Sequence, residues 1–151
     1  YLESLYRRYG YYRNELRNLY LTGLEGRQQM ARMMDSLRHD PPRMLADLPV
    51  QAVEDWRDEQ GRFGPLKGAT DAASRNVLAF TFGPSARLVI RPSGTEPKAK
   101  VYIEVCTGPK APHQDESAWK EQCRLADQQA SRLGDEFVQL ALARSKNNGA
   151  S

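Results

Sequence analysis

The sequence is poor in the residues that crosslink or metallate small domains. Its 151 residues include two cysteines, Cys106 and Cys123, and two histidines, His39 and His113. No C-x-x-C pair occurs, and neither histidine stands at ligand spacing from another metal-binding residue. This pattern argues against a disulfide scaffold and against a zinc site. We expect two reduced thiols in a reducing compartment.

Long apolar runs and a strong net charge are also lacking. No stretch approaches the roughly 20 apolar residues that a membrane-spanning helix needs, so we expect no membrane partner. The formal net charge of +3 is too small to indicate a nucleic-acid-binding protein without a clustered basic face. The chain begins at Tyr1 rather than at methionine, and we interpret it as trimmed, so that a missing targeting segment says little.

What the sequence does contain is a regular alternation of helical and strand patterns. Apolar residues at helical spacing predict helices over residues 1–9, 24–38 and 117–143. Apolar runs bounded by turn residues predict strands over residues 11–22, 49–57, 77–82, 86–90 and 101–105. Segment 58–76 holds three glycines and a proline and is predicted to be a loop. The last residues, 147–151, are predicted to be a disordered tail.

These elements indicate an α+β fold. Helices stand apart in the sequence from a group of hairpin-linked strands, which favours an antiparallel sheet over a parallel one. We expect a sheet of about four strands with two helices packed on one face. The composition, 40% hydrophobic and 27% charged, suits a single globular domain that builds its core without crosslinks.

The segment "RPSGTEPK", residues 91–98, separates two predicted strands and carries the donors that a phosphate needs. Arg91 offers a planar fork that matches two phosphate oxygens. Ser93 and Thr95 add hydroxyl donors, and Gly94 lets the backbone approach closely. The amides of residues 93–95 could then point the same way and form an anion nest. Lys98 adds a point charge where the loop ends.

A plain turn is the competing interpretation of this segment, because proline, serine, glycine and threonine populate most turns. Glu96 does not fit as a phosphate ligand. We expect it to face away and to pair with a cation such as Lys98 or Lys100, or to accept backbone N–H groups within the loop. The segment matches neither G-x-x-x-x-G-K-[ST] nor G-x-G-x-x-G, so nucleotide-binding templates do not apply.

The N-terminus suggests a different function. Six of the seven tyrosines lie within residues 1–20, interleaved with arginines, and stacking aromatics with cations is how single-stranded nucleic acid is held. A stand-alone nucleic-acid-binding module is therefore the alternative hypothesis. Against it, Glu3 and Glu15 dilute the charge, and the tyrosines equally suit an amphipathic helix and strand packed on another domain. A third interpretation is a lid or interaction module without a ligand.

A family resemblance bears on this choice. "IRPSGTEPKAKVYIE" resembles the C-terminal phosphate-binding loop of the α-D-phosphohexomutases, which include phosphoglucomutase and phosphomannomutase. "LYRRYGYY", "EGRQQMARMMDSLRHDPP" and "VLAFTF" precede it in the order that long members of the family show. The resemblance covers residues 2–106, whereas "GPLKGATDAASRN", residues 64–76, departs from the family's shorter run.

The resemblance implies a fold, an activity and a site. Family members interconvert hexose 1-phosphate and hexose 6-phosphate through a hexose 1,6-bisphosphate intermediate, as cytoplasmic intramolecular phosphotransferases. They use a phosphoserine and a Mg²⁺ loop in upstream domains, and neither motif is present in this sequence. By position, the substrate phosphate contacts fall on Arg91, Ser93, Gly94, Thr95 and, less directly, Lys98. No catalytic residue and no metal ligand is expected in this chain.

The resemblance also implies a domain division. Residues 1–10 match the last helix and hinge of a preceding domain, and residues 11–146 match the phosphate-binding C-terminal domain, followed by the tail 147–151. Expected partners are a hexose phosphate substrate and the upstream domains of the same polypeptide, with no nucleic acid. The resemblance leaves the choice between glucose, mannose and amino sugars open, and it implies that this chain alone has no mutase activity.

Overall fold

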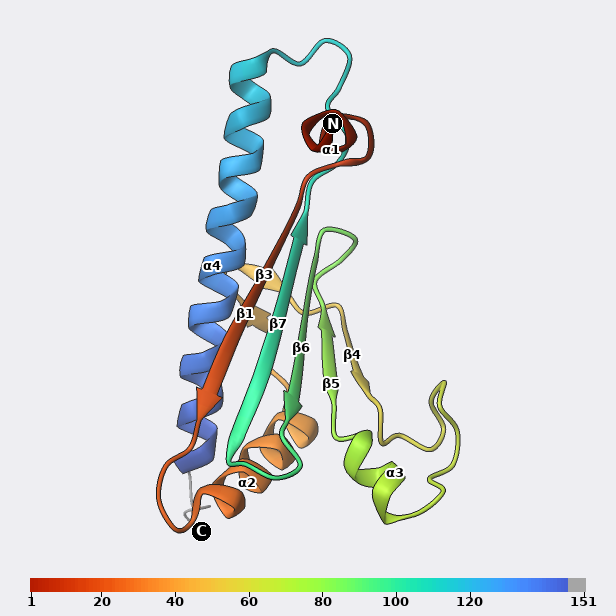
Figure 1. The fold of residues 1–151 in the computed structure, drawn as a ribbon, viewed down its shortest axis with the longest axis vertical. Helices are drawn as coiled ribbons and strands as arrows, with labels where there is room; N and C mark the ends of the chain where they lie inside the picture. The colour runs from red at the N-terminus through yellow and green to blue at the C-terminus, as the bar shows by residue number, and fades with distance from the viewer. Residues whose placement is uncertain (147–151) are drawn as a thin grey trace.

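A five-stranded antiparallel sheet forms the centre of the molecule. The computed structural model describes residues 1–146 and orders the strands β1-β7-β6-β5-β4 (Figure 1). The strands of this sheet span Tyr12–Tyr20 (β1), Ala52–Asp55 (β4), Leu78–Thr81 (β5), Ala86–Pro92 (β6) and Lys98–Cys106 (β7). A separate two-stranded ladder pairs Met44–Leu45 (β2) with Leu48–Pro49 (β3). The helices span Leu2–Tyr9 (α1), Gly26–His39 (α2), Ala69–Ser74 (α3) and Glu116–Lys146 (α4).

Two helices cover one face of the sheet. The long helix α4 runs beside β1 and β7, and α2 crosses behind the lower end of the strands (Figure 1). This arrangement confirms the predicted α+β class, with five strands in the main sheet where about four were expected. The predicted tail, residues 147–151, lies outside the described residues. None of the helices within residues 1–146 has the length and apolar character needed to cross a membrane.

The core lies between the sheet and these two helices. Strict alternation along β7 buries Ala99, Val101, Ile103 and Val105 and turns the intervening residues away. The phenyl ring of Phe137 on α4 meets that of Phe80 on β5 at a centroid distance of 5.5 Å. Helix α2 contributes the methionines and leucine whose spacing predicted it: Met30, Met33, Met34 and Leu37. The sheet is therefore anchored from one side, and its other face is available for a site.

Segment 58–76 contains a helix that its composition concealed. Helix α3 forms within the predicted loop, because Asp71 accepts hydrogen bonds from the Lys67 amide and from the Arg75 side chain. Arg75 also donates to the carbonyl oxygens of Gly64 and Pro65, at 2.8 and 3.4 Å. These contacts fold the segment onto itself at the end of the sheet where the 91–98 loop also lies (Figure 1).

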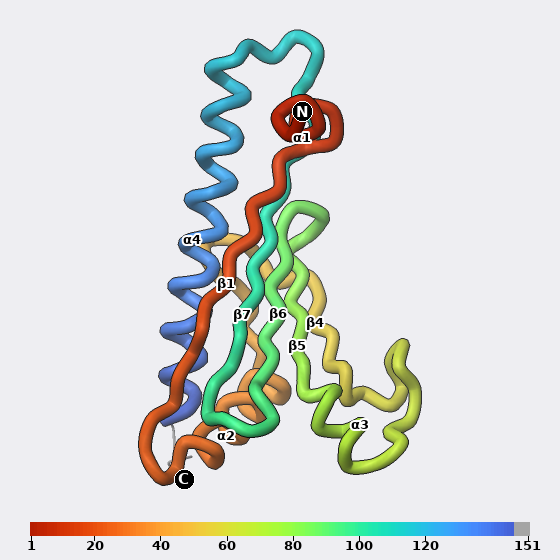
Figure 2. Tube along the Cα trace, in the orientation of Figure 1, coloured from red at the N-terminus to blue at the C-terminus, as the bar shows by residue number. Residues whose placement is uncertain are grey.

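Helix α1 is fastened to the connection between β7 and α4, which lies beside it (Figure 2). The Arg7 guanidinium bonds Glu116 at 2.7 Å, and the Lys110 amide donates to the Arg7 carbonyl at 2.9 Å. Gly10 is buried with φ of 105°, and a Cβ atom there would lie 2.3 Å from the Thr107 carbonyl oxygen. Only glycine fits this close approach.

Tyr11 continues the same attachment and gives a pH-dependent prediction. Burial, together with the 2.6 Å hydrogen bond from its hydroxyl to Asp127, raises the pKa of Tyr11 from 10.0 to about 12. The fold thus holds the proton more tightly than the unfolded chain does. The stabilisation is complete below pH 10 and is lost as the pH rises towards about 12.

The expected result is a free energy of unfolding that falls between pH 10 and pH 11, with a shallower fall in Tyr11→Phe, which has no phenol to ionise. Denaturant unfolding at several pH values measures both slopes. Equal slopes in the two proteins would show that Tyr11 titrates as it does in the unfolded chain.

Candidate anion-binding site

The site forms where β6 and β7 approach the loop that joins them. The register places Arg91 on β6 directly opposite Lys100 on β7. Both side chains are exposed, whereas their neighbours Ile90 and Val101 are fully buried, so the two cations project from the face away from the helices. The next residue in this row is Asn18 on β1, which is uncharged.

The positive charge of this row is not neutralised by the protein. Within residues 1–146, neither Arg91 nor Lys100 forms an ion pair with a carboxylate. Like charges directly opposite each other on a sheet repel, so without a bound anion this pair destabilises the folded state. An anion placed between them would remove this repulsion. Lys100 was missed as a site residue in the sequence, because only the register reveals that it faces Arg91.

The loop between the strands is closed by its own backbone. The Ser93 amide donates to the Lys98 carbonyl at 2.7 Å, and the Lys98 amide donates to the Glu96 carbonyl at 2.7 Å. Gly94 does not adopt positive φ. The predicted nest of three parallel amides from residues 93–95 is therefore wrong for this geometry, because the Ser93 amide is used to close the hairpin.

Ser93 organises the tip of the loop instead. Its Oγ atom accepts hydrogen bonds from the amides of Thr95 and Glu96, each at 3.3 Å. A serine hydroxyl has two acceptor lone pairs and one donor hydrogen, so both lone pairs are occupied and the O–H is left to donate. The Gly94 amide makes no hydrogen bond to any other described residue. The loop thus offers the Gly94 amide hydrogen and the Ser93 hydroxyl hydrogen, and the latter has the Thr95 hydroxyl 3.5 Å away as an acceptor within the loop.

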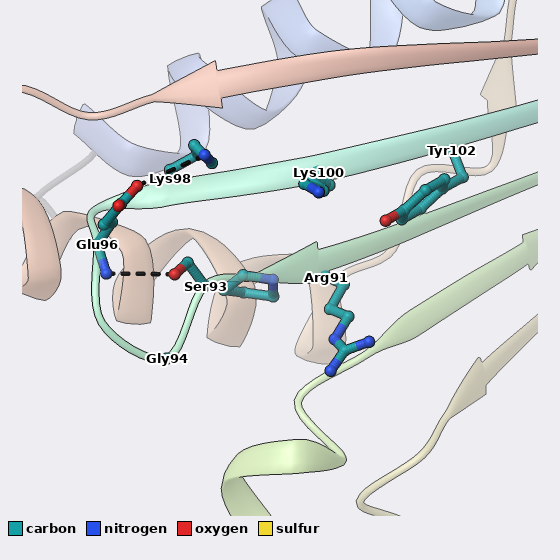
Figure 3. A pocket seen from close by; sticks show the side chains of 8 residues that line it. Arg91, Ser93, Gly94, Glu96, Lys98, Lys100 and Tyr102 are labelled. Carbon is teal, nitrogen blue, oxygen red and sulfur yellow. Dashed lines mark hydrogen bonds and ion pairs between the residues drawn. The ribbon is translucent and has the colours of Figure 1, made fainter.

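These donors share a pocket of about 370 Å³ with the strand-borne cations (Figure 3). The pocket extends from the loop tip along the sheet face to Tyr102, two residues beyond Lys100 on the same side of β7. At roughly 30 Å³ per water molecule, it has room for more than an inorganic phosphate. The lining residues are Arg91, Pro92, Ser93, Gly94, Glu96, Lys98, Lys100 and Tyr102.

Thr95 is the predicted site residue that the structure sets apart. It lines a second pocket, of about 210 Å³, on the side of the loop that faces α2. Ser93 and Gly94 line both pockets, so the loop tip is the wall between them. The Thr95 hydroxyl lies 3.5 Å from that of Ser93, which keeps it at the boundary of the larger pocket.

Glu96 pairs as the sequence predicted, although it does not face away. Its carboxylate lies 3.5 Å from the Lys98 ammonium, and its side chain lines the larger pocket (Figure 3). The Lys98 ammonium also lies 5.9 Å from the centre of the Tyr20 ring. Lys98 is therefore partly neutralised, and Arg91 and Lys100 carry the uncompensated charge of the site.

The N-terminal tyrosines and arginines do not form a comparable cationic surface. Arg13 pairs with Glu15 and lies 3.9 Å from Asp127, and Arg17 bonds Glu15 at 2.7 Å. The rings of Tyr6 and Tyr11 pack edge to face at a centroid distance of 5.1 Å. Of these contacts, the one from Arg13 to Asp127 joins β1 to α4, and together they give no support to a nucleic-acid-binding module.

The described residues do not contain a set of side chains that fits a metal ion. Within residues 1–146, no three His, Cys, Asp or Glu side chains converge at ligand distance. Cys106 and Cys123 are free thiols, and burial raises the pKa of each.

Comparison with known proteins identifies relatives of this architecture. Residues 40–118 match the family model for the phosphoglucomutase/phosphomannomutase C-terminal domain. The chain is 34% identical over 106 residues to a phosphoglucomutase of Staphylococcus haemolyticus, covering 69% of this chain and 19% of the relative. It is 33% identical over 122 residues to a phosphoglucomutase of Staphylococcus aureus strain MRSA252, covering 79% of this chain and 21% of the relative.

The chain therefore spans about a fifth of the length of these curated relatives. Among solved structures, it matches the open form of pp63/parafusin, a phosphoglucomutase from Paramecium, with a TM-score of 0.44 and 16% identity. That match covers 95% of this chain and 22% of the other.

Proposed function

Because this chain belongs to the phosphoglucomutase/phosphomannomutase family and carries its C-terminal domain, we propose that it holds the substrate phosphate that is not being transferred. The whole protein would interconvert hexose 1-phosphate and hexose 6-phosphate through a hexose 1,6-bisphosphate intermediate. One observation carries the proposal. Arg91 and Lys100 lie opposite each other on neighbouring strands, beside the Ser93 hydroxyl and the Gly94 amide, and neither cation has a carboxylate partner within residues 1–146.

The donors suit a phosphate in number and in chemical type. Arg91 supplies a planar fork, Lys100 and Lys98 supply point charges, and Ser93 and Gly94 supply a hydroxyl and an amide. Thr95 would join from the rim, where its hydroxyl lies 3.5 Å from that of Ser93. Each hydrogen bond to a charged group contributes on the order of 1.5–3 kcal/mol, so a few of them outweigh any single apolar contact in the pocket.

This set of contacts suits a substrate that must bind in two orientations. A bisphosphate that turns over between the two half-reactions presents its C6 phosphate to the loop in one step and its C1 phosphate in the other. Groups that donate hydrogen bonds to phosphate oxygens, and not to the sugar, can bind either phosphate. Binding energy from this remote group would orient the reacting oxygen elsewhere in the protein, which raises the rate of the chemical step.

The remaining parts of the reaction belong to the rest of the polypeptide. We assign the phosphoserine and the Mg²⁺ site to upstream domains, as the resemblance to the family implies. The C-terminal domain would close the cleft between them by hinging near residues 9–13. On this proposal the 151-residue chain alone is inactive as a mutase, and the full enzyme works in the cytoplasm.

Phosphate titration of the 151-residue chain tests the site directly. We expect binding of inorganic phosphate or glucose 6-phosphate with a dissociation constant of about 1 mM or weaker, because only one wall of the cleft is present. In ¹⁵N-resolved NMR spectra, the amides of Arg91, Ser93, Gly94, Thr95 and Lys100 should shift together along one saturating curve.

The Arg124 amide on α4 serves as an internal reference, since Arg124 pairs with Glu121 away from the loop. Loop signals that stay fixed at high phosphate while signals elsewhere move would place the anion at a different site and refute the assignment.

A further inference from the structure

Helix α2 and the residues just before it contact the back of the 91–98 loop at three positions, Leu21, Gly26 and Arg27. The Leu21 amide donates to the Pro97 carbonyl at 2.8 Å. Gly26 touches the Pro97 ring so closely that a Cβ atom there would lie 2.8 Å from the Pro97 Cβ. The Arg27 guanidinium donates from Nη2 to the Thr95 carbonyl oxygen at 3.0 Å. The loop is thus supported from behind by the start of the helix.

Arg27 stands where a helix disfavours a cation. The N-cap of α2 is Glu25, whose side chain makes no capping hydrogen bond, and the first turn itself contains no acidic residue. The N-terminal end of a helix carries partial positive charge. No carboxylate forms an ion pair with Arg27 in residues 1–146. Its one polar contact among the described side-chain bonds is the Thr95 carbonyl. The local helix does not account for this placement, whereas the loop does.

The bond from Arg27 fixes the orientation of one peptide plane. In a trans peptide, the carbonyl of one residue and the amide of the next point in opposite directions. Arg27 holds the Thr95 carbonyl towards α2, so the Glu96 amide must point the other way, and there it meets Ser93 Oγ at 3.3 Å. The Arg27 guanidinium, on the α2 side of the loop, therefore favours the hydrogen bond from the Glu96 amide to Ser93 Oγ on the pocket side.

The consequence reaches the Ser93 hydroxyl. With the amides of Thr95 and Glu96 on its two lone pairs, Ser93 can only donate its hydrogen. A hydroxyl that can only donate is already oriented to bind an anion. It loses less conformational entropy on binding than a hydroxyl that rotates freely. A flipped 95–96 peptide would free one lone pair and turn the Thr95 carbonyl oxygen, a partial negative charge, towards the pocket.

We propose that Arg27 is a positioning residue of the anion site, which sets the Ser93 hydroxyl as a donor by holding the Thr95–Glu96 peptide from the side of α2. The inference rests on the proposed function, because the bound group is taken to be a phosphate at the Ser93–Gly94 tip. Arg27 acts through the loop and does not itself touch the substrate.

The experiment compares Arg27→Gln, Arg27→Lys and Arg124→Gln in the 151-residue chain, with inorganic phosphate as the ligand. Arg124→Gln is the matched control, because it removes the same charge from an exposed helical arginine whose ion pair is with Glu121. We expect Arg27→Gln to weaken phosphate binding about five- to tenfold, less than the loss of a direct charged contact, because Arg27 acts on the phosphate only through the loop. Arg27→Lys keeps a donor and should recover most of the affinity.

A second measurement separates positioning from simple charge attraction. Heteronuclear NOE values and amide hydrogen exchange at Gly94, Thr95 and Glu96 report the order of the loop before phosphate is added. Positioning predicts increased mobility of these amides in Arg27→Gln and near wild-type values in Arg27→Lys and Arg124→Gln. A loss of affinity without any change in the free loop would overturn the proposal, as would affinity in Arg27→Gln within twofold of wild type. Failure of the wild-type chain to bind phosphate would instead refute the proposed function.

Discussion

Replacing Arg91 with alanine in the full-length protein is expected to lower kcat/KM by roughly 10²–10³-fold. The substitution removes a two-pronged, charge-assisted contact to the phosphate, for which about 3–4 kcal/mol is a reasonable total. At about 1.4 kcal/mol for each factor of ten, this energy corresponds to the stated loss. The loss should appear in kcat as well as in KM, because the remote phosphate orients the reacting group.

The matched control for this substitution is Arg87→Ala. Arg87 lies four residues earlier on the same face of β6, is equally exposed, and stands opposite Glu104 rather than Lys100. It lines neither of the two pockets beside the loop, so its removal should change kcat/KM less than about threefold. Steady-state kinetics with a hexose 1-phosphate measure both variants. Equal and small losses in Arg91→Ala and Arg87→Ala would favour a lid that closes the cleft without gripping the phosphate.

Replacing Phe137 with alanine is expected to lower the free energy of unfolding of the 151-residue chain by about 3–5 kcal/mol. The ring is fully buried between α4 and the sheet, against Phe80 of β5. Its removal leaves a cavity that the neighbouring strand and helix cannot both close. Typical domains have 5–15 kcal/mol of stability, so a large share would be lost.

Urea denaturation followed by circular dichroism measures this change, with Leu125→Ala as the control on the same helix. Leu125 is 50% exposed, and its truncation should cost less than about 0.5 kcal/mol. An unchanged urea midpoint in Phe137→Ala would mean that α4 does not pack on the sheet through this ring.

The sequence predicted those parts of the fold in which local pattern and burial agree. Val101, Ile103 and Val105 alternate because β7 has one buried face, and the α2 methionines repeat at helical spacing for the same reason. Elements fixed by particular side-chain hydrogen bonds were missed. Helix α3 was called a loop because of its surrounding glycines and proline, and it depends on Asp71 to organise the turn before it.

The β2–β3 ladder shows the same limitation more sharply. Its turn uses Ala46 and Asp47 at positive φ, 47° and 63°, without the glycine or asparagine that usually marks such a turn. Side chains of α4 hold it in place: Gln129 donates to the Ala46 carbonyl, and Arg132 pairs with Asp47 at 2.8 Å. These partners are more than 80 residues away in the chain, so no local pattern could have predicted the turn.

The candidate site was predictable in its chemistry and less so in its geometry. The residue types of the 91–98 loop indicated an anion, and the structure brings Arg91, Ser93, Gly94 and Lys98 to one pocket. Sequence reasoning could not place Lys100, since a lysine in an alternating strand is ordinarily a solvated side chain. It also assigned the Ser93 amide to a ligand, whereas the register of the hairpin commits that amide to the Lys98 carbonyl.

The attachment of α1 has a consequence for any movement of this domain against its neighbours. A rotation of the domain about residues 9–13 would have to separate Arg7 from Glu116 and move Gly10 away from the Thr107 carbonyl. Both contacts would have to break before the domain could turn, so the attachment of α1 opposes such a movement. Salt, which screens the exposed pair of Arg7 and Glu116, should therefore make the movement easier.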